Sequence, residues 1–195
     1  YTDEKGKTIY PLSLKDMYTL PMIPKLIDAG IYSFKIEGRM KTALYVATVA
    51  RTYRKAINDY LESPEKYQEN MPWYLDQISN CTYRQFTTGF FFGKPDETTQ
   101  IYDSNTYINE YIYLGIVDTV TEDGLARFEQ RNKFSVGEEI EFMKPDGTNV
   151  FAKVEKMYNE KMEEIESCPH PSEVTYIKCS EVPEKYDLLS IAKRE

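Results

Sequence analysis

A short charged turn between an apolar run and a long amphipathic segment constrains this chain most. The apolar run extends from Ile31 to Ile36, the turn from Glu37 to Lys41, and the amphipathic segment from Thr42 to Leu61. Three charges and a glycine at such a junction are typical of a buried parallel strand that leads into a helix. In α/β barrels and open sheets these junctions carry the chemistry. The pattern also fits a plain surface turn in which Glu37 pairs with Arg39.

The residues before this junction predict a further strand and helix. Ile9 to Ser13 is a strand candidate, and Leu20 to Ile27 keeps helical spacing up to Gly30, a residue type that ends helices. The resulting order, strand, helix, strand, helix, predicts a parallel sheet, for which two strands are too few. We therefore expect the other strands to come from residues outside this chain or from a second copy, as a homodimer through the incomplete N-terminal domain.

The amphipathic segment predicts a helix with an apolar stripe from Val46 to Leu61. Arg51 and Asp59 are expected on its solvated face. Pro64 predicts the end of this helix, and the apolar residues from Trp73 to Ile78 predict a further short one.

The second half of the chain changes from helical to alternating periodicity. Turn signals separate short apolar runs at about ten-residue spacing, which predicts a small closed antiparallel barrel. The domains are therefore predicted as residues 1–95, the C-terminal part of a barrel-like α/β domain, a linker at 96–110, and the small barrel at 111–195. The expected strands are Tyr111 to Val120, Leu125 to Gln130, Glu139 to Met143, Val150 to Met157, Val174 to Cys179 and Leu188 to Ala192.

Composition restricts the class of protein. The formal net charge of −8 disfavours non-specific nucleic-acid binding by the chain as a whole, although a local basic groove remains compatible with it. Three widely spaced cysteines predict neither a disulfide framework nor a metal site, and favour the cytoplasm. No apolar run is long enough for a transmembrane helix, so no membrane partner is expected. The start, without a methionine, suggests a piece of a longer protein.

No combination of nucleophile and base is evident, and the single histidine, His170, has no ligand or catalytic partner at a recognisable spacing. Three phenylalanines, Phe90 to Phe92, indicate either an aromatic plug between domains or a ligand-facing surface. Cations on strand-end loops are suited to anionic ligands. The candidate catalytic residues are Glu37, Arg39 and Lys35, and the candidate substrate-binding residues are Lys15, Asp16, Lys41 and Arg84.

Several motifs in the same order resemble the collagenase-like peptidase family U32. They are Ser13-Leu14-Lys15-Asp16, Ile23-Pro24-Lys25-Leu26-Ile27-Asp28-Ala29-Gly30, Ser33 to Lys41, Thr87-Thr88-Gly89-Phe90, Gly93-Lys94-Pro95, Gln130 to Phe134 and Pro169-His170-Pro171. The resemblance implies the C-terminal half of a family member, with an α/β barrel-like domain and a terminal β-barrel.

The resemblance leaves two activities open for the full-length protein. One is a collagenase-like peptidase, and the other is prephenate-dependent hydroxylation of tRNA or ribosomal RNA, so the implied substrate is a peptide or an RNA. An iron–sulfur cluster is implied on cysteines upstream of this chain, and no cofactor is expected within it. Tyr18 occupies a position where many relatives have cysteine. A third alternative is a non-catalytic binding module.

Overall fold

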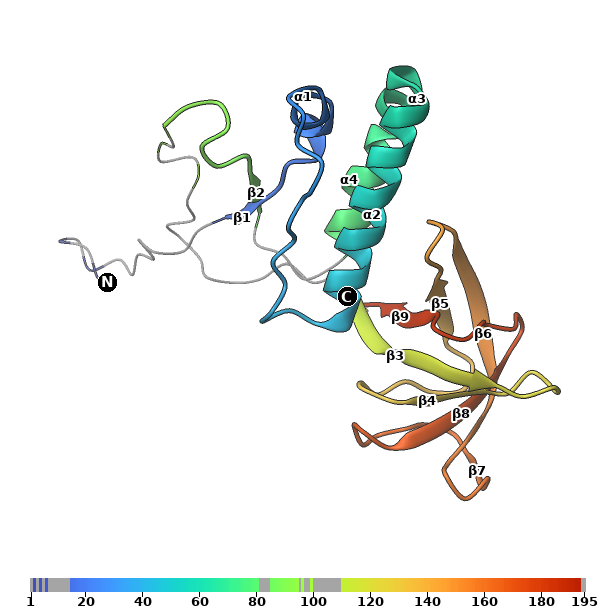
Figure 1. Ribbon diagram of the computed structural model, residues 1–195. Coiled ribbons are helices and arrows are strands. Elements are labelled where there is room, and N and C mark those ends of the chain that lie inside the picture. Colours follow the sequence, from blue (N-terminus) through green and yellow to red (C-terminus); the bar gives the residue numbers. More distant parts are fainter. Residues whose placement is uncertain are drawn as a thin grey trace. The chain divides into compact units, whose positions relative to one another are not determined.

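The computed structural model describes residues 2, 4, 6, 15–80, 85–94, 96, 99 and 110–193. The chain divides into two compact units, whose elements are labelled in Figure 1. The helical unit comprises residues 1–37 and 52–109, and the barrel unit comprises residues 38–51 and 110–195. No helix in the described part of the chain is long and apolar enough to cross a membrane.

The helical unit contains a two-stranded parallel sheet and a group of helices. Strand β1, Asp16–Met17, pairs in parallel with β2, Phe86–Thr87. The helices are η1, Leu20–Met22, α1, Ile23–Asp28, the part of α2, Ala43–Glu62, that begins at Thr52, α3, Pro64–Glu69, and α4, Met71–Ser79. Their core consists of Leu20, Ile23, Ala56, Tyr67, Tyr74 and Ile78.

Gly30 ends α1, as the sequence predicts. Gly30 has a φ of +81°, and its amide donates to the carbonyl of Ile27 at 2.8 Å. The next amide, that of Ile31, donates to the carbonyl of Leu26 at 3.1 Å. These two bonds form a Schellman motif, which satisfies carbonyls that the end of the helix would otherwise leave without donors.

One expectation for the helical unit is wrong, and another is confirmed. The segment from Ile31 to Ile36 forms no strand, and among the described residues only β1 and β2 pair in this unit. The predicted end of the long helix at Pro64 is confirmed, because α2 stops at Glu62. Pro64 also begins α3 as its first residue, because the Ser63 hydroxyl accepts from the Lys66 amide at 3.0 Å and caps that helix. The strand predicted at Ile9 to Ser13 lies outside the described residues.

The barrel unit contains the six predicted strands. They are β3, Tyr111–Val120, β4, Ala126–Glu129, β5, Glu139–Met143, β6, Asn149–Tyr158, β8, Val174–Cys179, and β9, Leu188–Ala192. A further short strand, β7, Glu164–Ile165, pairs with β6 and was not predicted.

The six strands close on themselves. Their order is β5-β9-β3-β4-β8-β6, and β6 pairs again with β5, with every pairing antiparallel. Alternate residues of each strand point inward and exclude water from one core, while closure removes free edges. The core residues are Leu114, Val117, Ala126, Phe128, Phe134, Ile140, Phe142, Ala152, Val154, Met157, Cys168, Ile177, Cys179 and Leu189.

Candidate functional site

The predicted site centres on the turn that leads into α2. The amide of Lys41 donates to the carbonyl of Gly38 at 2.9 Å, which closes the turn. Thr42 then caps the helix, because its hydroxyl accepts from the Tyr45 amide at 3.2 Å. A Cβ atom on Gly38 would lie 2.8 Å from Cγ2 of Val46, so only glycine fits there without a shift. The turn is therefore packed directly against the first turns of α2.

Cations dominate the exposed surface of this segment. Lys35 and Arg39 are exposed, as is Glu37, and Lys41 is half-buried. Nζ of Lys41 lies 4.7 Å from the centre of the Tyr45 ring, a cation–π contact that holds this side chain along the helix. The cations of the turn thus outnumber its carboxylate, as anion binding requires.

The first half of α2 anchors the turn to the barrel. Nη1 of Arg51 donates to Oδ1 of Asn149 at 2.7 Å and to the carbonyl oxygen of Lys144 at 3.0 Å. The hydroxyl of Thr48 lies 3.4 Å from Sδ of Met143. Arg39 and Lys41 therefore belong to the barrel unit, a placement that the sequence analysis missed.

Arg51 is buried, contrary to its expected place on the solvated face, with 8% of its surface exposed. Burial lowers the pKa of its guanidinium to about 10, although the nearby carboxylates Glu141 and Asp146 act in the opposite direction. Arg51 consequently remains a cation at neutral pH. Its charge stabilises the contact with the barrel and is not available to a substrate.

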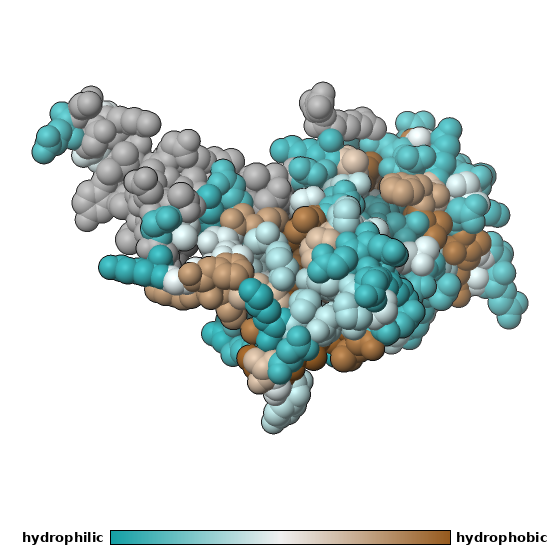
Figure 2. All heavy atoms as spheres, turned by 90° about the horizontal axis from the view of Figure 1, so that it is seen from above, coloured by the Kyte–Doolittle hydropathy of each residue, from teal (hydrophilic) through white to brown (hydrophobic). Residues whose placement is uncertain are grey.

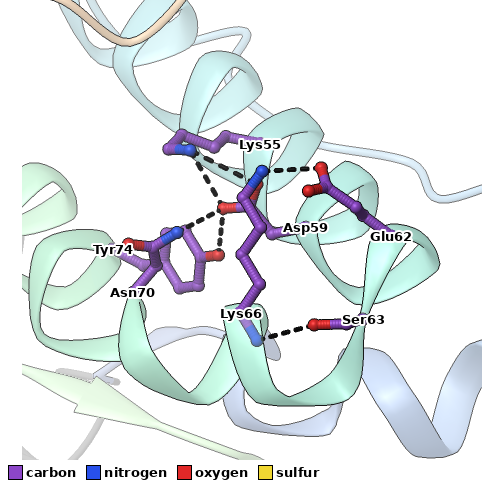
Figure 3. A network of polar contacts seen from close by, with 7 residues as sticks. All are labelled: Lys55, Asp59, Glu62, Ser63, Lys66, Asn70 and Tyr74. Carbon is purple, nitrogen blue, oxygen red and sulfur yellow. Dashed lines mark hydrogen bonds and ion pairs between the residues drawn. The ribbon is translucent and has the colours of Figure 1, made fainter.

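Asp59, also expected on the solvated face, is 4% exposed and joins three helices of the helical unit. Its carboxylate accepts from the Tyr74 hydroxyl at 2.6 Å and the Asn70 amide at 2.9 Å, and lies 3.0 Å from Nζ of Lys55 (Figure 3). Burial disfavours the charge, but these hydrogen bonds outweigh it and lower the pKa of Asp59. The side chains point inward between α2, α3 and α4, so the network is structural.

The remaining predicted residues lie elsewhere. Lys15 and Asp16 lie at β1, where the Asp16 amide donates to the Gln85 carbonyl at 2.9 Å. That they converge with Glu37 and the turn stays a prediction. Arg84 lies outside the described residues.

The aromatic segment forms no strand. Phe90, Phe91 and Phe92 form turns and expose 78%, 44% and 66% of their surfaces. Nζ of Lys25 lies 5.1 Å from the centre of the Phe92 ring. Apolar side chains are visible in brown among polar ones on the face shown in Figure 2.

The described thiols are unsuited to nucleophilic catalysis or to holding a cluster. Cys168 and Cys179 are buried in the barrel core, and burial raises the pKa of both, that of Cys179 to about 12. His170 is exposed and contributes its backbone carbonyl to a hydrogen bond from Gln130. Within the described residues, no three histidine, cysteine or acidic side chains come together as metal ligands.

Comparison with known proteins reveals two family matches. Residues 1–101 match the description "Peptidase family U32", and residues 109–190 match "Peptidase family U32 C-terminal domain". A crystal structure of the C-terminal domain of a Geobacillus thermoleovorans protein assigned to the U32 peptidases covers 42% of this chain and 92% of its own, with 26% identity and a TM-score of 0.38.

The proteins to which the chain is similar carry two kinds of name. It is 35% identical to tRNA hydroxylation protein P1 of Bacillus subtilis (strain 168) and 30% identical to tRNA hydroxylation protein P of Escherichia coli (strain K12), over 87% of the chain in each case. It is 33% identical to a collagenase of Porphyromonas gingivalis over 76% of the chain. The chain spans 40%, 36% and 41% of these relatives.

Proposed function

Because the chain belongs to peptidase family U32, we propose that the protein of which it forms part acts in prephenate-dependent hydroxylation of tRNA. The observation that carries this proposal is the 35% identity to the B. subtilis tRNA hydroxylation protein, which extends over 87% of the chain. The chain spans 40% of that relative, so the activity is proposed for the whole protein.

In this proposal the turn before α2 binds phosphate groups of the RNA. Arg39 is exposed on a turn that a hydrogen bond closes and that the buried Arg51 fixes to the barrel through α2. A guanidinium can bind two phosphate oxygens at once, and a lysine beside it adds charge. Lys35 and Lys41 take that second role, and Glu37 orients a donor of the substrate. Lys15, Asp16 and Arg84 complete the predicted substrate-binding set.

Peptide hydrolysis is the second candidate, and the similarity to the P. gingivalis collagenase favours it. Such a reaction needs an activated nucleophile or a metal-bound water. The described residues supply two buried thiols with raised pKa values and no group of three metal ligands. These features favour the RNA reaction, as does the excess of cations on the turn.

The iron–sulfur cluster that the family resemblance implies does not fit the described cysteines. Cys168 and Cys179 pack within the barrel core among apolar side chains. A cluster in the whole protein would therefore take its ligands from other cysteines, and this chain contributes RNA contacts to the reaction.

A deletion strain complemented with the full-length gene tests the proposal. Mass spectrometry of nucleosides from its tRNA should show the loss of a hydroxylated nucleoside and its return with the wild-type gene. Digestion of casein and gelatin by the purified full-length protein forms the second arm. Unchanged tRNA in the deletion strain together with reproducible proteolysis would overturn the RNA proposal in favour of the peptidase.

A further inference from the structure

We propose that a pocket at one end of the barrel binds an aliphatic ammonium group. The pocket has a volume of about 460 Å³, which falls within the usual range for small ligands. It lies between the turn that joins β6 to β7 and the loop before β8, and we call it the mouth pocket. Its lining includes the polar residues Glu160, Glu163, Ser167, Ser172, Glu173 and Thr175.

The floor of the mouth pocket carries an inward-pointing hydroxyl. Thr175 is 1% exposed, and it shares the inner face of β8 with Ile177 and Cys179, which belong to the barrel core. Its side chain forms no hydrogen bond with any described residue. This hydroxyl is a buried polar group that a ligand in the pocket can satisfy.

Gln130 lies beside the mouth pocket, next to its lining residues. It follows β4 on the same inward face as Phe128, which pairs with Thr175, and it is fully buried. Its Nε2 donates to the carbonyls of Cys168, at 2.9 Å, and His170, at 2.5 Å, which flank a residue of the pocket. Its Oε1 has no partner among the described residues. An amide oxygen only accepts hydrogen bonds, so a buried acceptor is left unsatisfied next to the pocket.

Backbone strain also concentrates beside the mouth pocket. Among described non-glycine residues, positive φ occurs at Met162, Ser172 and Tyr186, with values of 61°, 70° and 77°. Met162 lies in the β6–β7 turn, and Ser172 lines the pocket itself. Strained backbone is concentrated at binding sites, because the surrounding structure must hold it in place.

The charges around the mouth pocket favour a cationic ligand. The rim carries Glu160, Glu163 and Glu173 against a single cation, Lys161. Glu163 already accepts from Nδ2 of Asn159 at 2.7 Å, which fixes the turn and leaves the other two carboxylates for a ligand. The field of the barrel adds to this preference, because residues 110–193 contain 18 acidic and ten basic side chains, whereas residues 1–109 contain 13 of each. RNA phosphate is repelled here.

An alkyl ammonium fits this set better than a metal ion. Its three N–H donors match the carboxylates of Glu160 and Glu173 and the hydroxyl of Thr175. Its aliphatic chain can lie against Ile165 and Val174 of the lining. Within the described part of the chain no three potential metal ligands converge. Such a group can come from a free polyamine or from a lysine side chain of a partner protein, and it is independent of the RNA reaction.

Isothermal titration of the chain with spermidine tests the proposal. We expect saturable binding at one site, weakened about tenfold or more by Glu160→Gln with Glu173→Gln, because each charged hydrogen bond contributes strongly to affinity. Thr175→Val should weaken binding as well. The matched control is Glu155→Gln with Glu181→Gln, which changes the net charge equally at exposed carboxylates outside the pocket and should leave the affinity within about twofold.

A second arm uses the blocked tripeptide acetyl-Gly-Lys-Gly-amide. Tighter binding of the tripeptide identifies a protein lysine as the natural ligand, and tighter binding of spermidine identifies a free polyamine. The proposal fails if neither probe binds saturably. It also fails if the control pair weakens binding as much as the pocket pair, which would leave only the general field of the barrel. Circular dichroism of each variant verifies that the barrel is folded.

Discussion

Arg51 donates from Nη1 to Oδ1 of Asn149 at 2.7 Å, across 98 positions of sequence. This bond ties the middle of α2 to the start of β6, in the hairpin that follows β5. The turn with Arg39 and Lys41 is thereby part of the barrel unit. The proposed RNA contacts of Arg39 and Lys41 consequently depend on the folded barrel.

Replacing Arg51 should loosen this attachment. Arg51→Met removes the hydrogen bonds that Arg51 donates to the Lys144 carbonyl and to Oδ1 of Asn149, at a cost of about 2 kcal/mol. Hydrogen exchange of the amides in β5 and β6 measures the effect. Arg54→Met, at an exposed position of the same helix, should change stability by less than about 0.5 kcal/mol. Equal effects of both substitutions would contradict the anchoring role.

Asp59 predicts a dependence of stability on pH. Its folded-state pKa is lowered, so its contribution is present above the unfolded pKa of about 3.9 and is lost as the pH falls through the folded value. Urea unfolding followed by the fluorescence of Trp73, the single tryptophan, reports on the helical unit. Asp59→Asn should lower the free energy of unfolding at pH 7 by about 2 kcal/mol. The variant should also lose less stability than the wild type as the pH falls below about 4. The exposed control Glu69→Gln should retain the wild-type profile.

Gly38 should tolerate no side chain unless Val46 is shortened. In Gly38→Ala the new Cβ would meet Cγ2 of Val46 at 2.8 Å, so the turn must shift. We expect a lower melting temperature and reduced tRNA hydroxylation by the full-length protein. Val46→Ala in the same chain should restore both, since it removes the conflicting methyl group. Failure of this rescue would show that Gly38 is required for another reason.

Arg39→Ala should reduce tRNA hydroxylation by the full-length protein about tenfold or more. Stability should change by less than about 1 kcal/mol, because Arg39 is exposed. Lys178→Ala removes one exposed cation from β8 and serves as the control for net charge. If the two variants retained the same activity, the turn would not be the RNA-binding element.

The exposed apolar side chains of the helical unit predict self-association. Met17, Phe90 and Phe92 expose 65%, 78% and 66% of their surfaces. Large apolar areas in water favour contact between copies. Multi-angle light scattering of the chain should detect a dimer, and Phe90→Ser with Phe92→Ser should shift it towards the monomer. A monomer at all concentrations would disprove the homodimer.

The barrel strands could be predicted from the sequence because their signals are local. Alternation and turn residues define β3, β5, β8 and β9 with the observed bounds. The run from Ile31 to Ile36 shows the limit of such signals. An apolar run becomes a strand only when a neighbour supplies hydrogen bonds, and no described residue pairs with it.

The buried charges could not be predicted for a different reason. Charged residues in an amphipathic helix are assigned to water by default. Arg51 is buried because the β5–β6 hairpin folds over it, and Asp59 because α3 and α4 return to it. Asn149 and Tyr74, the partners of these two residues, lie outside α2, so the helical periodicity of α2 gives no indication of them. The Ser63-Pro64 pair, in contrast, is a local start signal for α3 that could have been read from the sequence.

Barrel closure has a consequence for synthesis on the ribosome. The last strand, β9, inserts between β3 and β5 and pairs with both. Until residues 188–192 leave the exit tunnel, β3 and β5 each present an edge with unpaired amides and carbonyls. The nascent barrel must therefore wait for its final residues before it can close. A chain that stops before Leu188 should be recognised as unfinished and degraded, however complete its earlier strands are.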